Sequence, residues 1–230
     1  GVTISNVDLS DNTGVLNISS SVAIAVSDVD HQTEVAGDDL GNTVSFAGSS
    51  GAVTYTVAAL GYNMDEDDVI TGGSGSSDTL SFDLEDDDVS ATITGFETIR
   101  IADADEGTLD LSNSSGYTTI EFDAVTTDET SVTNVASGTA IAVTDEGSDI
   151  LAINAASAGS SLSVTYEDAN EYDGGDTLSF GANVSTVSVA VDEDDTDVDE
   201  IDMVFAGNIT LNITGDDSTD DVLALVLDQA

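Results

Sequence analysis

Residues 64–84 read MDEDDVITGGSGSSDTLSFDL, and this stretch contains the pattern that the rest of the chain repeats. An acidic run leads into a short apolar step and then into a glycine-rich turn. After the turn, Leu80, Phe82 and Leu84 alternate with polar residues. A period of two places these three side chains on one face of a strand. The stretch therefore predicts an acidic or glycine-rich turn followed by a short, one-sided strand.

The turns of this kind are candidate cation sites. Glycines permit the positive φ angles of a tight turn, which lets carbonyl oxygens converge. Carboxylate and carbonyl oxygens are the ligands that Ca²⁺ prefers, so we predict several Ca²⁺ ions in the fold. The predicted ligands are Asp65, Glu66, Asp67, Asp68, Asp78, Asp173, Asp176, Asp216, Asp217, Asp220 and Asp221. The alternative for each turn is a solvated, self-repelling loop, and it weighs more for the acidic run 192–200, which has no glycine.

Three segments carry a resemblance to known proteins. Residues 72–80, GGSGSSDTL, resemble the calcium-binding RTX nonapeptide GGxGxDxLx, with one extra serine before Asp78. Residues 94–99, TGFETI, and 109–113, LDLSN, are similar to phrases in large secreted bacterial surface-layer proteins. The resemblance implies an extracellular protein in which RTX-type turns alternate with plain β-solenoid or β-sandwich stretches.

The spacing of apolar segments predicts an all-β fold. Strand-sized segments recur about every 8–12 residues, and no segment shows the period of a helix. We predict a tandem-repeat β-solenoid or a β-sandwich-like architecture. Stacked repeats of this kind bury a continuous core while their turns line up along an edge.

Longer internal similarities indicate a diverged duplication. Residues 22–28 recur as 139–145, residues 53–55 as 164–166, and residues 77–82 as 175–180, in the same order. We therefore predict a first β repeat over 1–132 and a second over 133–230. This alignment also equates Asp78 with Asp176, each just before a Leu-Ser-Phe strand.

The charge excludes several classes of partner. One Arg, no Lys and 47 acids give a formal charge of −46. Such a chain repels nucleic acid and anionic membrane surfaces, and it has no apolar run long enough for a membrane helix. Disorder, halophile-type surface solvation and cation binding would each explain the acids. The alternating strands argue against disorder, and the other two explanations are compatible with each other.

The residues needed for common catalytic sites are scarce. His31 is the one histidine, its flanking residues show no nucleophile elbow, and Cys and Trp are absent. We predict that the protein is not an enzyme. Arg100 lies between Ile99 and Ile101 on a predicted strand, where we expect an ion pair with neighbouring acids.

The last predicted strand, 222–227, is apolar on both faces. We predict an interface with a second copy through Val222, Ala224 and Val226, the alternative being a buried central strand. Since the chain opens on Gly1 within a strand-like pattern, we expect a processed chain or part of a longer one. The predicted function is that of a secreted, calcium-dependent, self-assembling surface-layer or filament subunit. A calcium-rigidified repeat module of a large secreted adhesin is the alternative.

Overall fold

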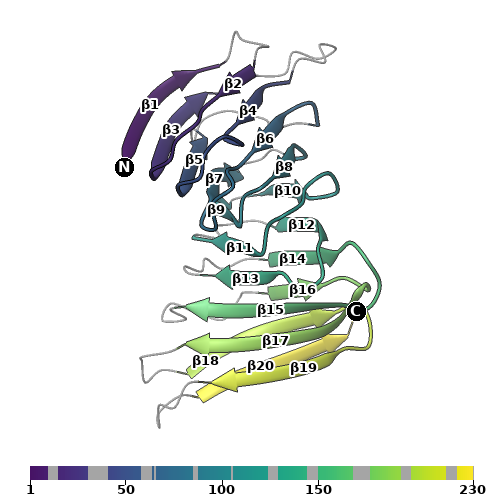
Figure 1. The fold of residues 1–230 in the computed structure, drawn as a ribbon. Coiled ribbons are helices and arrows are strands. Elements are labelled where there is room, and N and C mark those ends of the chain that lie inside the picture. The colour runs from purple at the N-terminus through teal and green to yellow at the C-terminus, as the bar shows by residue number, and fades with distance from the viewer. Residues whose placement is uncertain are drawn as a thin grey trace.

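A computed structural model describes residues 1–9, 15–30, 41–57, 64, 66–84, 88–104, 106–123, 129–143, 150–167, 177–192, 198–215 and 222–229. These residues form twenty β-strands and no helix, wound into a parallel β-solenoid (Figure 1). The all-β prediction is confirmed, and of its two architectures the solenoid is the one observed.

The strands divide between two faces of the solenoid. A ten-stranded sheet forms one face from β1 (Val2–Asp8), β3 (Ile24–Asp30), β5 (Val53–Val57), β7 (Thr79–Leu84), β9 (Thr98–Ala104), β11 (Thr119–Phe122), β13 (Ala140–Val143), β15 (Ser160–Glu167), β17 (Val184–Asp192) and β19 (Thr210–Gly215). A four-stranded sheet begins the other face with β2 (Val15–Asn17), β4 (Thr43–Ser45), β6 (Val69–Thr71) and β8 (Thr92–Thr94). A six-stranded sheet continues that face with β10 (Gly107–Asp110), β12 (Thr130–Val135), β14 (Ile150–Ala155), β16 (Thr177–Phe180), β18 (Val198–Phe205) and β20 (Val222–Gln229).

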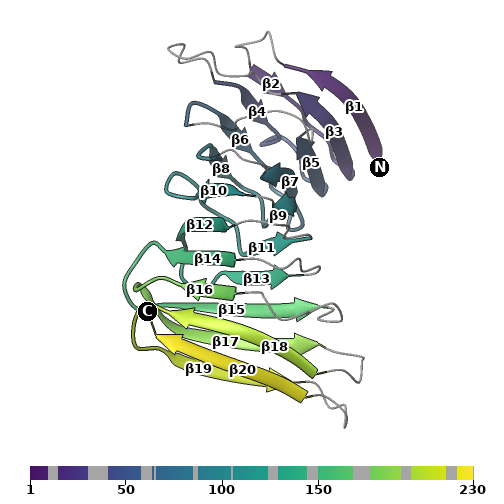
Figure 2. The same ribbon diagram turned by 180° about the vertical axis from the view of Figure 1, so that it is seen from behind.

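Successive strands alternate between the two faces, and each strand pairs in parallel with the strand two further along the chain. One coil of the solenoid is therefore one odd-numbered and one even-numbered strand. The coils stack from β1 at one end to β19 and β20 at the other, as the view from behind also shows (Figure 2). Parallel bridges from Val89 to Leu109 and from Thr94 to Ser115 link the two sheets of the second face.

Period-two alternation fills the space between the faces. One interior column follows the ten-stranded sheet through Val26, Tyr55, Leu80, Ile99, Ile120, Ile141, Val164 and Val189, each at most 1% exposed. Burying one such side chain stabilises the fold by roughly 1.5–3 kcal/mol before entropy is subtracted. Phe46 packs against Tyr55 and Phe96 with ring centroids 5.4 and 6.4 Å apart, and Phe180 stacks on Phe205 at 5.5 Å. A few phenylalanines among aliphatic columns thus replace the missing tryptophan.

The outer surface of the ten-stranded sheet contains a row of small uncharged side chains. In register this row is Thr3, Ala25, Thr54, Thr79, Thr98, Thr119, Ala140, Ser163, Ser188 and Asn212. Since like charges directly opposite each other destabilise paired strands, an uncharged row suits a sheet in a chain this acidic.

The proposed division into two repeats stays a prediction about ancestry. The boundary at 132/133 lies inside β12, and the ten-stranded sheet continues past it without a break. The equivalence of Asp78 and Asp176 is wrong in the observed fold. Asp78 precedes β7 of the ten-stranded sheet, whereas residue 176 precedes β16 of the six-stranded sheet. The same local phrase therefore enters opposite faces.

Close approach of two coils requires glycine at residue 72. A Cβ there would lie 2.1 Å from the carbonyl oxygen of Gly95 in the next coil. We expect Gly72→Ala to lower the free energy of unfolding by about 1–3 kcal/mol, because the backbone must move to relieve the overlap. Gly207→Ala is the matched control, since its nearest neighbour would be Ala182 O at 3.7 Å. Urea unfolding of both variants checks this, and equal midpoints would contradict it.

Candidate functional site

The two edges of the solenoid differ in charge. The segments that lead from an even-numbered strand to the next odd-numbered strand are rich in Ser, Gly, Ala and Asn, and their acids are Asp78 and Glu97. We call this the neutral edge: residues 18–23, 46–52, 72–78, 95–97, 111–118, 136–139, 156–159, 181–183 and 206–209. The segments that lead from odd-numbered to even-numbered strands contain most of the 47 acids. We call these connections the acidic edge.

Serine hydrogen bonds join successive coils along the neutral edge. The Ser20 N–H donates to Ser49 Oγ at 3.0 Å, and the Ser74 N–H donates to the carbonyl oxygen of Ser49 at 2.8 Å. Ser19 Oγ likewise donates to the carbonyl oxygen of Gly48 at 2.8 Å. This edge is therefore held by short uncharged contacts that need no ion.

Asp78 is the central residue of the glycine-rich turn from which the sequence analysis began. It is 0% exposed, and its carboxylate accepts the N–H of Val53 through Oδ1 and of Gly73 through Oδ2, both at 2.8 Å. Its own N–H donates to Glu97 Oε2 at 2.8 Å. The carboxylate thus fastens three coils, since β5, β7 and β9 each contribute a turn. The prediction that Asp78 binds calcium stays a prediction beside this observed structural role.

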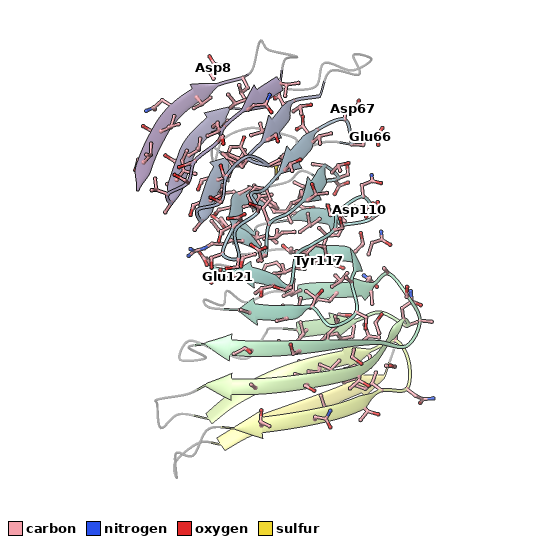
Figure 3. All side chains as sticks on the ribbon, viewed as in Figure 1. Asp8, Glu66, Asp67, Asp110, Tyr117 and Glu121 are labelled. Carbon is pink, nitrogen blue, oxygen red and sulfur yellow. The ribbon has the colours of Figure 1, made fainter. Side chains whose placement is uncertain are left out.

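Asp68 has a similar place at the acidic edge. It is 2% exposed, and its Oδ1 accepts the N–H of Asn42 in the preceding coil. Burial, with the charge of Asp68 as a second cause, raises the pKa of Tyr55 well above its ordinary range. Glu66 and Asp67, in the same connection, are exposed and lie on the outer side of the turn before β6 (Figure 3).

The predicted calcium ligands in the described part of the chain do not converge. Among these residues no group of three or more acidic or histidine side chains is placed to hold a metal ion. Of the remaining predicted ligands, Asp65, Asp173, Asp176, Asp216, Asp217, Asp220 and Asp221 lie outside the described residues. His31 and residues 193–197 of the acidic run 192–200 lie outside them as well.

The predicted ion pair of Arg100 is confirmed. Arg100 Nε donates to Asp123 Oδ2 at 2.6 Å, and the guanidinium forms a salt bridge with the same carboxylate. The hydrogen bond to Asp123 raises the pKa of Arg100. The Arg100 side chain is 44% exposed, so this pair contributes little to stability.

Sequence analysis missed the hydrogen-bonded turn at Asp110. Its Oδ1 accepts the N–H of Ser112 at 2.9 Å and Nδ2 of Asn134 at 2.7 Å. Partial burial opposes ionisation, but these hydrogen bonds outweigh it and lower the pKa of Asp110. The sequence signal for the local part is Asp-x-Ser directly after a strand, which favours an Asx turn. The Asn134 contact comes from the next coil and has no local signal.

Comparisons of the chain with family models, curated protein sequences and solved structures found no match. Within the described residues, no helix is present that is long and apolar enough to cross a bilayer. The coarse identification is therefore a parallel β-solenoid with one neutral and one acidic edge.

Proposed function

We propose that this protein is a structural, self-assembling β-solenoid of the cell exterior whose acidic edge is neutralised by several Ca²⁺ ions. The observation that supports this most directly is the separation of charge between the two edges. Neighbouring parallel strands stack about 4.8 Å apart, so acids in successive connections begin and end within that distance of one another. This is well inside the Debye length of about 10 Å at 0.1 M ionic strength, and salt alone screens such pairs only partly.

Calcium suits this edge better than a monovalent ion does. Ca²⁺ takes 6–8 oxygen ligands in a flexible geometry, so one ion is able to bridge carboxylates of adjacent connections. Binding energy that is available only when the coils are stacked becomes folding and assembly energy. The RTX-like turn at 72–80 and the surface-layer-like segments agree with this proposal. Extracellular fluid, where calcium is abundant, is the proposed location, and the proposed partner is a second copy of the chain.

The second candidate is a spacer module of a large secreted adhesin. A continuous ten-stranded ladder also supports a stiff rod that displays another domain. The two functions differ in self-association: a spacer stays monomeric in millimolar Ca²⁺, whereas an array or filament subunit polymerises. Electron microscopy of the purified chain with and without calcium distinguishes them.

The last strand offers a test of lateral assembly. Register pairs Val226 with Asp202 and Ala224 with Glu200, two positions out of step with the buried Met203. We expect Val226→Asp to leave the subunit folded in calcium and to abolish higher assembly, as light scattering would show. Ordinary polymerisation of this variant would remove Val222, Ala224 and Val226 from the assembly surface.

A further inference from the structure

Exposed hydrophobic residues gather at the two ends of the solenoid. In the described part of the chain, the large apolar side chains that are exposed are Val2, Ile4, Val15, Val22 and Ile213. The first four belong to the first coil and its closing turn, and Ile213 belongs to β19. These two coils lie at opposite ends of the stack (Figures 1 and 2). Elsewhere the coils cover one another, so exposure marks the coil surfaces on which no further coil is stacked.

Both exposed ends belong to the same interior column. Ile4 pairs in register with Val26 at one end, and Ile213 pairs with Val189 at the other. The members between them are at most 1% exposed, whereas Ile4 is 37% and Ile213 is 44% exposed. Val2 and Leu211 continue a second apolar position in the same way, beside Ile24 and Val187. The two ends are thus the two halves of the coil-on-coil contact that the molecule repeats along its length.

We propose that the last coil of one copy stacks on the first coil of a second copy, with β19 adding in parallel to β1. This assigns the contact surfaces for the assembly proposed above and rests on that proposed function. In the described part of the chain β19 pairs only with β17 and β1 only with β3, so each has one edge left for a further strand. An exposed sheet edge of this kind is a template for pairing with another chain.

The register of the new contact follows from the register inside the molecule. Ile213 lies over Ile4 and Leu211 over Val2, which completes the apolar columns. On the outer face Asn212 lies over Thr3 and Thr214 over Ser5, so no like charges oppose each other across the sheet. A second copy fits better than an unrelated partner because each end matches what the other lacks. The contact is heterologous and does not close, so it generates an open filament.

Two single substitutions test the contact in the 230-residue chain in millimolar Ca²⁺. We expect Ile4→Asp and Ile213→Asp each to lower the association constant by at least about a hundredfold, because the new charge must be buried in the contact. Both positions are already exposed in the single copy, so the variants should fold, which circular dichroism checks. Ser188→Asp adds the same charge to the outer face of β17 and is expected to assemble as the unmodified chain does.

An equimolar mixture of the two variants gives the sharpest result. The Ile4→Asp chain keeps an intact last coil and the Ile213→Asp chain an intact first coil, so sedimentation velocity should show dimers and nothing larger. Variants that polymerise alone, or a mixture that stays monomeric while the unmodified chain polymerises, would overturn the end-to-end contact and leave assembly through another face. An unmodified chain that stays monomeric at every calcium concentration would overturn the proposed function with it.

A cysteine pair tests the same contact without adding charge. The chain contains no cysteine, so Ile4→Cys/Ile213→Cys introduces one thiol at each end. Stacked copies place the two Cα atoms at about the spacing of adjacent strands, within the 4.4–6.8 Å that a disulfide needs. Mild oxidation should then give a ladder of covalent oligomers on a non-reducing gel, whereas Ile4→Cys/Ser188→Cys should give none. Equal yields from the two pairs would count against the contact.

Discussion

Removal of divalent cations with EDTA at low ionic strength is expected to unfold the protein. The chain has 47 acids and one basic residue, and most of the acids lie in connections at one edge of the solenoid. Two unit charges 4 Å apart in water repel by about 1 kcal/mol, and every added coil adds several such pairs. Repulsion summed over the stack is comparable to the whole stability of a domain, about 5–15 kcal/mol. Circular dichroism should lose its β signal in EDTA and recover it when Ca²⁺ is added.

The control for this experiment separates specific cation binding from screening. NaCl at the ionic strength of the calcium solution should restore less of the signal, and Mg²⁺ should restore less than Ca²⁺ because it demands a stricter octahedral geometry. If the spectrum in EDTA at low salt equals that in calcium, the solenoid does not depend on cations for folding. The acids would then serve halophile-type solvation of the surface.

Asp78→Ala is expected to cause the largest loss of stability of any single acid substitution in the described part of the chain. The substitution leaves the N–H groups of Val53 and Gly73 buried without their acceptors. Each unsatisfied buried donor costs about 1–3 kcal/mol, so the free energy of unfolding should fall by about 2–6 kcal/mol. Urea unfolding in saturating calcium measures this. Ser76→Ala, an exposed change in the same turn, should shift the free energy by less than about 0.5 kcal/mol.

The same variant distinguishes the two roles of Asp78. A structural role predicts the loss of stability even when calcium is saturating, because the missing hydrogen bonds do not involve the ion. A ligand role predicts, in addition, that folding of Asp78→Ala requires more calcium than folding of the unmodified chain. If saturating calcium restores full stability, the hydrogen bonds to Val53 and Gly73 contribute little and Asp78 acts through the ion. Asp176→Ala, no longer equivalent by position, need not behave in the same way.

The local pattern predicted the buried faces of the strands. Leu80, Phe82 and Leu84 alternate with polar residues in the sequence, and all three are buried on β7. Alternation is a property of neighbouring residues in an extended chain, so the sequence alone is sufficient to predict it. The ion pair of Arg100 was predictable for a related reason, since acids surround the single cation of the chain at every distance.

The sheet that each strand joins was decided only by the tertiary structure. Residues 78–82 and 176–180 both read Asp-Thr-Leu-Ser-Phe, yet they enter opposite faces, because a strand's face depends on how many strands precede it rather than on its own residues. Parallel pairing joins residues such as Leu80 and Ile99 that lie a full coil apart, and local propensity contains no information about that distance. The alternation of acidic and neutral segments is visible along the chain from the start. Only the winding of strands between two faces collects those segments into one acidic and one neutral edge, and leaves Ile4 and Ile213 uncovered at the two ends of one column.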